Sequence, residues 1–157
     1  MNVYKTQEGK EIILKEYRKH LDSNPAAGLL QRTIQTPQGE TFILEKQHEG
    51  KPPLLLLHGS VSNSASWLGV IPLFSKNFHV YCIDIPGEPG LSSDNRFLLS
   101  SNLPELWISN VLDGLGLHSA SFLGMSLGGW YALNFAVHYP HRVSSLSLIS
   151  AAGFAGQ

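Results

Sequence analysis

The sequence has little cysteine, little net charge and only short apolar runs. Its 157 residues contain one cysteine, Cys82, which excludes an internal disulfide framework and is typical of a reducing compartment. The net charge of −1 gives no electrostatic reason to expect nucleic acid or an anionic membrane as a partner. Apolar runs such as residues 54–57 are too short to cross a bilayer, and residues 1–11 lack an apolar signal-peptide core. These features favour a cytoplasmic globular protein.

The N-terminal region is expected to form a helical arm. Residues 11–21 place apolar side chains at helical spacing, and the Asp-Ser-Asn-Pro segment at residues 22–25 ends this pattern. We therefore predict two parts, an N-terminal helical arm over residues 1–28 and a core domain over residues 29–157.

Beyond the arm, the hydrophobic pattern alternates between strand and helix. Residues 32–36 and 41–45 flank a Pro-Gln-Gly turn and predict an antiparallel β-hairpin. Further strands are expected at residues 54–57, 80–84, 120–124 and 143–150, with helices between them at residues 65–74, 103–115 and 127–138. This order predicts an α/β fold with three α/β/α layers, in which the N-terminal antiparallel hairpin extends a doubly wound, mostly parallel sheet.

A polar residue stands at the carboxyl end of each predicted parallel strand. These residues are His58, Asp84, Ser126 and Ser150. In doubly wound sheets, ligands bind beyond the carboxyl ends of the strands. We expect the four side chains to gather along one rim of the sheet.

Residues 124–128 read Gly-Met-Ser-Leu-Gly, with a strand predicted before Ser126 and a helix after it. A strand that runs directly into a helix strains the residue at the corner, at a cost of about 1–3 kcal/mol. Side chains two positions to either side would collide, so glycine fits at both places. The pattern predicts a hydroxyl held clear of the backbone at the positive end of a helix dipole, which suits a nucleophile.

Four segments together resemble the α/β-hydrolase superfamily, and within it the carboxylesterase-like serine hydrolases. They are residues 54–60 with the following Trp67, residues 82–87, the elbow at residues 124–129, and residues 138–143. Their order and their placement on strands, turns and helices match the family. The resemblance implies hydrolysis of a small carboxylic ester without a cofactor.

The resemblance also implies roles for individual residues. Ser126 would be the nucleophile, and the backbone N–H of Leu127 would contribute to an oxyanion hole. The backbone N–H of Ser60 is expected to be the second donor, with that of Val61 as the alternative. Three residues are expected to line the substrate pocket: Val61, Met125 and Trp67.

Other polar residues near these motifs have structural interpretations. His58 precedes the oxyanion turn and is expected to brace it. Asp84 precedes the nucleophile in the chain and is expected to be structural as well. The loop over residues 87–92 carries one residue more than the family pattern, and Glu88 within it is expected to be a solvated charge. The histidines lack metal-ligand spacing, so no metal site is predicted.

The family's acid and histidine follow the nucleophile in the chain. After Ser126 this sequence has no Asp or Glu, and its later histidines are His138 and His141. These lie at the far end of a predicted helix roughly 18 Å long, out of hydrogen-bond reach of Ser126. The sequence is therefore expected to be a truncated form of the fold, nearly inactive by itself.

Two alternatives stay open. The chain could be a catalytically incomplete binding domain, in which the edge strand at residues 143–150 self-associates or pairs with a partner segment. A cofactor-free haloperoxidase or a C–C bond hydrolase would use the same elbow.

Overall fold

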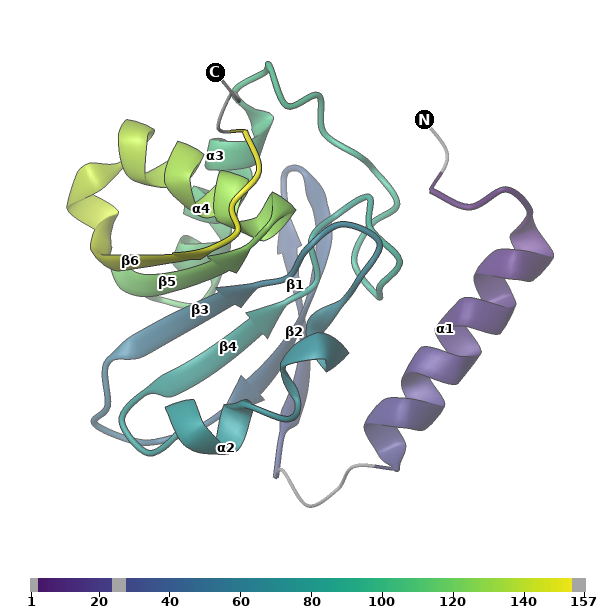
Figure 1. The fold of residues 1–157 in the computed structure, drawn as a ribbon, viewed down its shortest axis with the longest axis horizontal. Coiled ribbons are helices and arrows are strands. Elements are labelled where there is room, and N and C mark those ends of the chain that lie inside the picture. The colour runs from purple at the N-terminus through teal and green to yellow at the C-terminus, as the bar shows by residue number, and fades with distance from the viewer. Residues whose placement is uncertain (1–2, 24–27, 154–157) are drawn as a thin grey trace.

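A mixed six-stranded sheet forms the centre of the molecule, for which a computed structural model describes residues 3–23 and 28–153 (Figure 1). The strands are β1 (Leu30–Thr36), β2 (Gly39–Lys46), β3 (Pro53–Leu57), β4 (His79–Ile83), β5 (Ala120–Met125) and β6 (Val143–Ile149). They are ordered β1-β2-β4-β3-β5-β6. β1 and β2 pair antiparallel, as do β2 and β4, whereas the remaining pairs are parallel.

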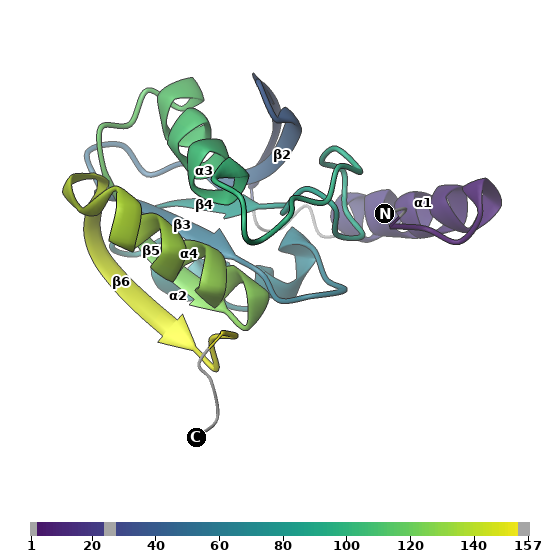
Figure 2. The ribbon, with the colours of Figure 1, turned by 90° about the horizontal axis from the view of Figure 1, so that it is seen from above.

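Helices cover both faces of this sheet. They are α1 (Gln7–Asp22), η2 (Ser64–Trp67), α2 (Ile71–Phe74), α3 (Leu103–Gly114), α4 (Leu127–His138) and η3 (Pro140–Arg142). α3 and α4 pack into the core on one face, and α2 packs into the core on the other. The view from above shows α3 next to α4 (Figure 2). The predicted α/β fold, with its antiparallel hairpin at the start of a mostly parallel sheet, is confirmed.

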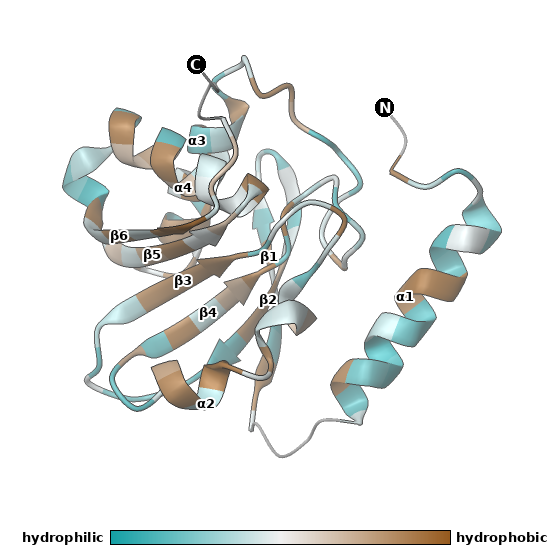
Figure 3. Cartoon of the chain, viewed as in Figure 1, coloured by the Kyte–Doolittle hydropathy of each residue, from teal (hydrophilic) through white to brown (hydrophobic). Residues whose placement is uncertain are grey.

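The four leucines of β3 explain why this strand lies at the centre. Successive side chains of a strand point to opposite faces. Leu55 and Leu57 therefore pack in the core under α3 and α4, whereas Leu54 and Leu56 pack in the core on the other face. Apolar residues run along β3 and β5 (Figure 3), because both strands are covered from two sides.

The chain changes direction in the sheet at β3, and this places the candidate site. From β3 the chain crosses first to β4 on one side and then to β5 on the other. The two crossovers leave a crevice at the carboxyl ends of β3 and β5, which is where ligands bind in open α/β sheets.

One predicted helix differs in the structure. Residues 65–74 form two short helices, η2 and α2, instead of one continuous helix. Pro72 lies in the first turn of α2, where its missing N–H costs nothing, but it could not continue a helix begun at residue 65. The prediction of a single crossover helix is therefore wrong.

The predicted N-terminal helix is present and longer than expected. Thr6 caps α1 by accepting the Gly9 N–H at 3.0 Å, so the helix begins at Gln7. Tyr17 and Leu21 are buried against the core. Residues 1–2 and 24–27 of the predicted arm lie outside the described residues. No helix in the described part of the chain is both long and apolar enough to span a membrane.

Candidate active site

Ser126 occupies a strained turn between β5 and α4. Its φ of 50° and ψ of −114° are unusual for a residue with a side chain. Neighbouring backbone groups hold the turn: the Ser126 N–H donates to the Ile149 carbonyl at 2.9 Å, and the Ser126 carbonyl accepts the Ala152 N–H at 2.9 Å. The side chain is half-buried, and its hydroxyl has no hydrogen-bond partner among the described residues.

The two glycines of the motif are required by close backbone approach. A Cβ at position 124 would overlap the carbonyl of Gly128, and one at position 128 would overlap the carbonyl of Leu57. Both glycines thus allow α4 to start directly against β5 and β3, as the sequence pattern predicts.

The structure brings the loop after β3 against this turn. A Cβ built on Gly59 would lie 3.5 Å from the Cβ of Ser126. Leu127 is the first residue of α4, so its N–H has no acceptor within the helix. The Ser60 N–H likewise has no acceptor in the part of the chain that the structure describes, whereas the Val61 N–H donates to Oε2 of Glu88 at 2.6 Å. The N–H groups of Leu127 and Ser60 thus have no acceptor among the described residues, whereas that of Val61 is engaged.

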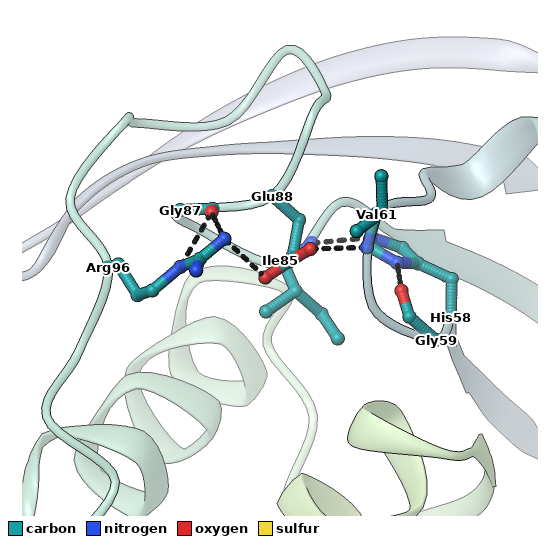
Figure 4. Close-up of polar contacts among 7 residues, drawn as sticks. All are labelled: His58, Gly59, Val61, Ile85, Gly87, Glu88 and Arg96. Carbon is teal, nitrogen blue, oxygen red and sulfur yellow. Dashed lines mark hydrogen bonds and ion pairs between the residues drawn. The ribbon is translucent and has the colours of Figure 1, made fainter. Parts of the chain in front are cut away.

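His58 supports this loop and is not placed as a base. Its Nδ1 is 2.8 Å from the Gly59 carbonyl, and its Nε2 accepts the Ile85 N–H at 2.9 Å (Figure 4). These partners assign the proton to Nδ1 in a neutral ring. Burial lowers the pKa of His58, which keeps the ring neutral.

Asp84 is a buried structural carboxylate at the end of β4. Its Oδ1 accepts the Ser64 N–H at 2.8 Å and the Tyr17 hydroxyl at 3.0 Å, and its Oδ2 accepts the Leu91 N–H at 2.8 Å. It therefore ties η2, α1 and the loop after β4 together. No sequence pattern indicated the contact with Tyr17, because the two residues are 67 positions apart.

A pocket of about 210 Å³ opens beside the turn. Its lining residues are Ser60, Val61, Pro86, Glu88, Arg96, Phe97, Leu99, Leu127 and Tyr131. Val61 is one of these residues, but Trp67 and Met125 are not. Trp67 instead packs in the core on the α2 side of the sheet, and Met125 packs against the same core.

Glu88 lies in this pocket and is not solvated. Its side chain is 5% exposed and forms an ion pair with Arg96 at 3.0 Å. The expectation of a solvated loop charge is wrong, because Arg96, eight residues further on, folds back over the loop.

In the described part of the chain, no histidine or carboxylate is hydrogen-bonded to the Ser126 hydroxyl. His138 lies at the end of α4 and is 2.9 Å from the Asn134 carbonyl. Within residues 3–23 and 28–153, no three His, Cys, Asp or Glu side chains form a group that could hold a metal ion.

Comparisons with known proteins identify the family. Residues 52–155 match the profile of the family described as the alpha/beta hydrolase fold. The chain is 33% identical over 119 residues to an uncharacterized carboxylesterase, nap, of Bacillus subtilis, covering 76% of this chain and 40% of that protein. It is 36% identical over 105 residues to monoacylglycerol lipase ABHD6 of Bos taurus, covering 66% and 31%.

Solved structures of similar proteins lead to the same family. Carboxylesterase CesB (YbfK) from Bacillus subtilis superposes with a TM-score of 0.78 at 30% identity, covering 88% of this chain and 50% of that one. Naproxen esterase from Bacillus subtilis superposes with a TM-score of 0.80 at 27% identity, covering 95% and 52%. The chain thus spans about 40% of the length of the carboxylesterase nap and about half of these two structures. The carboxylesterase-like resemblance is confirmed, and this chain belongs to the α/β-hydrolase fold family.

Proposed function

We propose that residues 1–157 supply the nucleophile and the oxyanion hole of a serine hydrolase that cleaves small carboxylic esters. The observation that carries this proposal is the strained turn, which holds an unpaired Ser126 hydroxyl beside two free backbone N–H groups. The carboxylesterases and the lipase among its relatives support an ester as substrate.

In the proposed reaction, Oγ of Ser126 attacks the ester carbonyl carbon. The new Oγ–C bond forms as the carbonyl electrons move to oxygen, and the N–H groups of Leu127 and Ser60 bind this oxyanion. The serine proton passes to a base and then to the departing alcohol as its C–O bond breaks. Water then attacks the acyl-enzyme in the same way and releases the acid.

We propose that the base and the acid of this mechanism are not supplied by the described residues, none of whose histidines or carboxylates is hydrogen-bonded to Ser126. The resemblance implies a histidine oriented by a carboxylate, and His58, the buried histidine near the turn, already uses both ring nitrogens. We therefore propose that the 157 residues alone turn over esters slowly. In a comparable enzyme, loss of the triad costs about 10⁶ in turnover and leaves the oxyanion and binding contributions.

Covalent labelling at alkaline pH tests the nucleophile without requiring turnover, because hydroxide can take the serine proton that the missing base would accept. A fluorophosphonate forms an Oγ–P bond with a reactive serine, releases fluoride, and passes the serine proton to the buffer. Peptide mass analysis of the labelled chain should place the adduct on Ser126, and Ser126→Ala should abolish it. Ser66→Ala, at an exposed serine of η2, is the matched control and should label normally.

Two results would overturn the proposal. One is a label spread over several serines, with no loss in Ser126→Ala. The other is tight binding of a ligand by a chain that never labels, which would favour the binding-domain alternative. Full-strength turnover of a p-nitrophenyl ester by the monomer, dependent on Ser126, would overturn only the claim of slow turnover.

A further inference from the structure

We propose that Glu88, paired with Arg96, is a positioning residue for the oxyanion loop, which we define as residues 58–61. Its carboxylate holds the Val61 N–H, fixes the shape of the loop and leaves the Ser60 N–H as the donor that faces the substrate. This inference rests on the proposed function, because it assigns the loop a task in oxyanion binding.

Each carboxylate oxygen of Glu88 accepts a hydrogen bond from a different segment of the chain (Figure 4). Its Oε2 accepts the Val61 N–H at 2.6 Å, and its Oε1 accepts Nη2 of Arg96 at 3.0 Å. The guanidinium of Arg96 also donates to the Gly87 carbonyl, from Nε at 3.1 Å and from Nη2 at 2.8 Å. A buried carboxylate is costly unless it is paired and hydrogen-bonded, and here both oxygens are bonded.

Val61 needs such a partner because its backbone is strained. Its φ is 53°, a conformation that β-branched residues rarely adopt. Its side chain is 81% exposed, so packing does little to hold the residue in place. The hydrogen bond to the Glu88 carboxylate therefore fixes Val61 in this conformation.

The loop after β4 holds the oxyanion loop at both ends. The Ile85 N–H donates to Nε2 of His58 at one end, and Glu88 accepts the Val61 N–H at the other. Within the loop after β4, the Glu88 N–H donates to the Ile85 carbonyl at 3.1 Å, so the two anchors are joined. Gly59 and Ser60 lie between the anchored residues, and Gly59 lies against Ser126.

Arg96 makes this arrangement compatible with an oxyanion. An unpaired carboxylate in the pocket would repel the negative charge that develops on the substrate. Glu88, Arg96 and Ser60 line the same pocket. The ion pair neutralises the carboxylate, and the Val61 N–H remains engaged by Glu88 and does not reach the substrate.

Fluorophosphonate labelling of the 157-residue chain tests the inference when the rate is measured against reagent concentration, which separates reversible binding from the chemical step. Glu88→Ala should lower the rate constant of labelling about 10- to 100-fold, because a misplaced donor weakens transition-state binding, and should change reversible binding little. Glu88→Gln retains an oxygen that accepts the Val61 N–H, so it should retain most of the rate.

A second substitution distinguishes a role of Glu88 in positioning the oxyanion loop from a role in the stability of the whole fold. Glycine adopts a positive φ without strain. Val61→Gly in the Glu88→Ala background should therefore restore part of the lost rate, although glycine usually makes a loop less stable. Glu105→Ala is the matched control, because Glu105 is also a buried carboxylate, 6% exposed, but bonds Asn134 between α3 and α4.

Amide hydrogen exchange gives a readout that does not depend on Ser126 reacting. Glu88→Ala should speed exchange at the Val61 amide, whereas Glu105→Ala should leave it unchanged. Equal effects of the two variants on labelling, or an unchanged Val61 amide in Glu88→Ala, would overturn the inference. Absence of any Ser126 label in the unmodified chain even at alkaline pH would instead overturn the proposed function, and the exchange result would still decide whether Glu88 holds the loop.

Discussion

The hydroxyl of Tyr17 donates a hydrogen bond of 3.0 Å to Oδ1 of Asp84, and both side chains are buried. This bond joins α1 to the end of β4, beside the candidate active site. The N-terminal helix is therefore fastened to the part of the core that carries the site loops. Burial raises the pKa of Tyr17, so the hydroxyl stays protonated and can donate.

Tyr17→Phe should destabilise the chain by about 1–3 kcal/mol, since it removes a hydrogen bond to a buried charged group. Urea unfolding measures this difference. Lys19→Ala, at an exposed position on the same helix, is the control and should have a small effect. If the two variants unfolded at the same urea concentration, Tyr17 would not anchor α1.

Gly128→Ala should destabilise the chain by about 1–3 kcal/mol, the range for inserting atoms into a packed site. The added methyl would overlap the backbone carbonyls of Leu57 and His58, which cannot move without shifting β3. Thermal unfolding measures the loss. Gly69→Ala is the matched control, because a Cβ there meets no atom within 4 Å. Similar melting temperatures for both variants would contradict this account of the elbow.

Glu45 should make stability depend on pH in acid. Burial would raise the pKa of Glu45, but hydrogen bonds from Arg32, His79 and Gln47 outweigh burial and hold the pKa below its ordinary value of 4.5. As the pH falls, the Glu45 carboxylate is therefore protonated at a higher pH in the unfolded chain than in the folded chain. The stabilisation is complete above about pH 4.5 and is lost as the pH falls through the folded-state pKa.

Urea unfolding between about pH 3 and pH 7 tests whether the stabilisation by Glu45 is lost as the pH falls. The stability gap between the unmodified chain and Glu45→Gln should be widest near neutral pH and should shrink in acid. Glu49→Gln removes the same charge at an exposed loop position and should show no such convergence. A gap that widened in acid would refute the assigned direction.

β6 is predicted to mediate self-association of the 157-residue chain. In the described sheet it pairs with β5 alone, and Ser145, Ser147 and Ile149 are exposed along it. An exposed strand edge can pair with another chain, and a lysine on the edge discourages this. Sedimentation velocity should show association that rises with concentration and that Ser147→Lys reduces.

The control for this prediction is Asn77→Lys, which adds the same charge at an exposed turn between α2 and β4. It should associate like the unmodified chain. A chain that stayed monomeric at every concentration, or two lysine variants with equal effects, would show that β6 does not mediate association.

The sequence predicted those parts of the fold that rest on local patterns. The four leucines of β3 indicated a strand buried on both faces, and the glycines at positions 124 and 128 indicated a turn with no room for side chains. Contacts between distant segments left no such signal. The partner of Asp84 lies in α1, and the burial of Glu88 depends on how Arg96 folds back, so neither could be predicted from spacing.

The position of β4 between β2 and β3 sets an order of assembly. β4 follows both strands in the chain, yet it is the strand that joins them. As the chain is synthesised, β2 and β3 therefore emerge without their shared neighbour, and α1 emerges before the β4 carboxylate to which Tyr17 binds. Long-range pairings of this kind slow folding and leave strand edges exposed for a time. Sheet growth during synthesis consequently waits for residues 79–83, however early the hairpin forms.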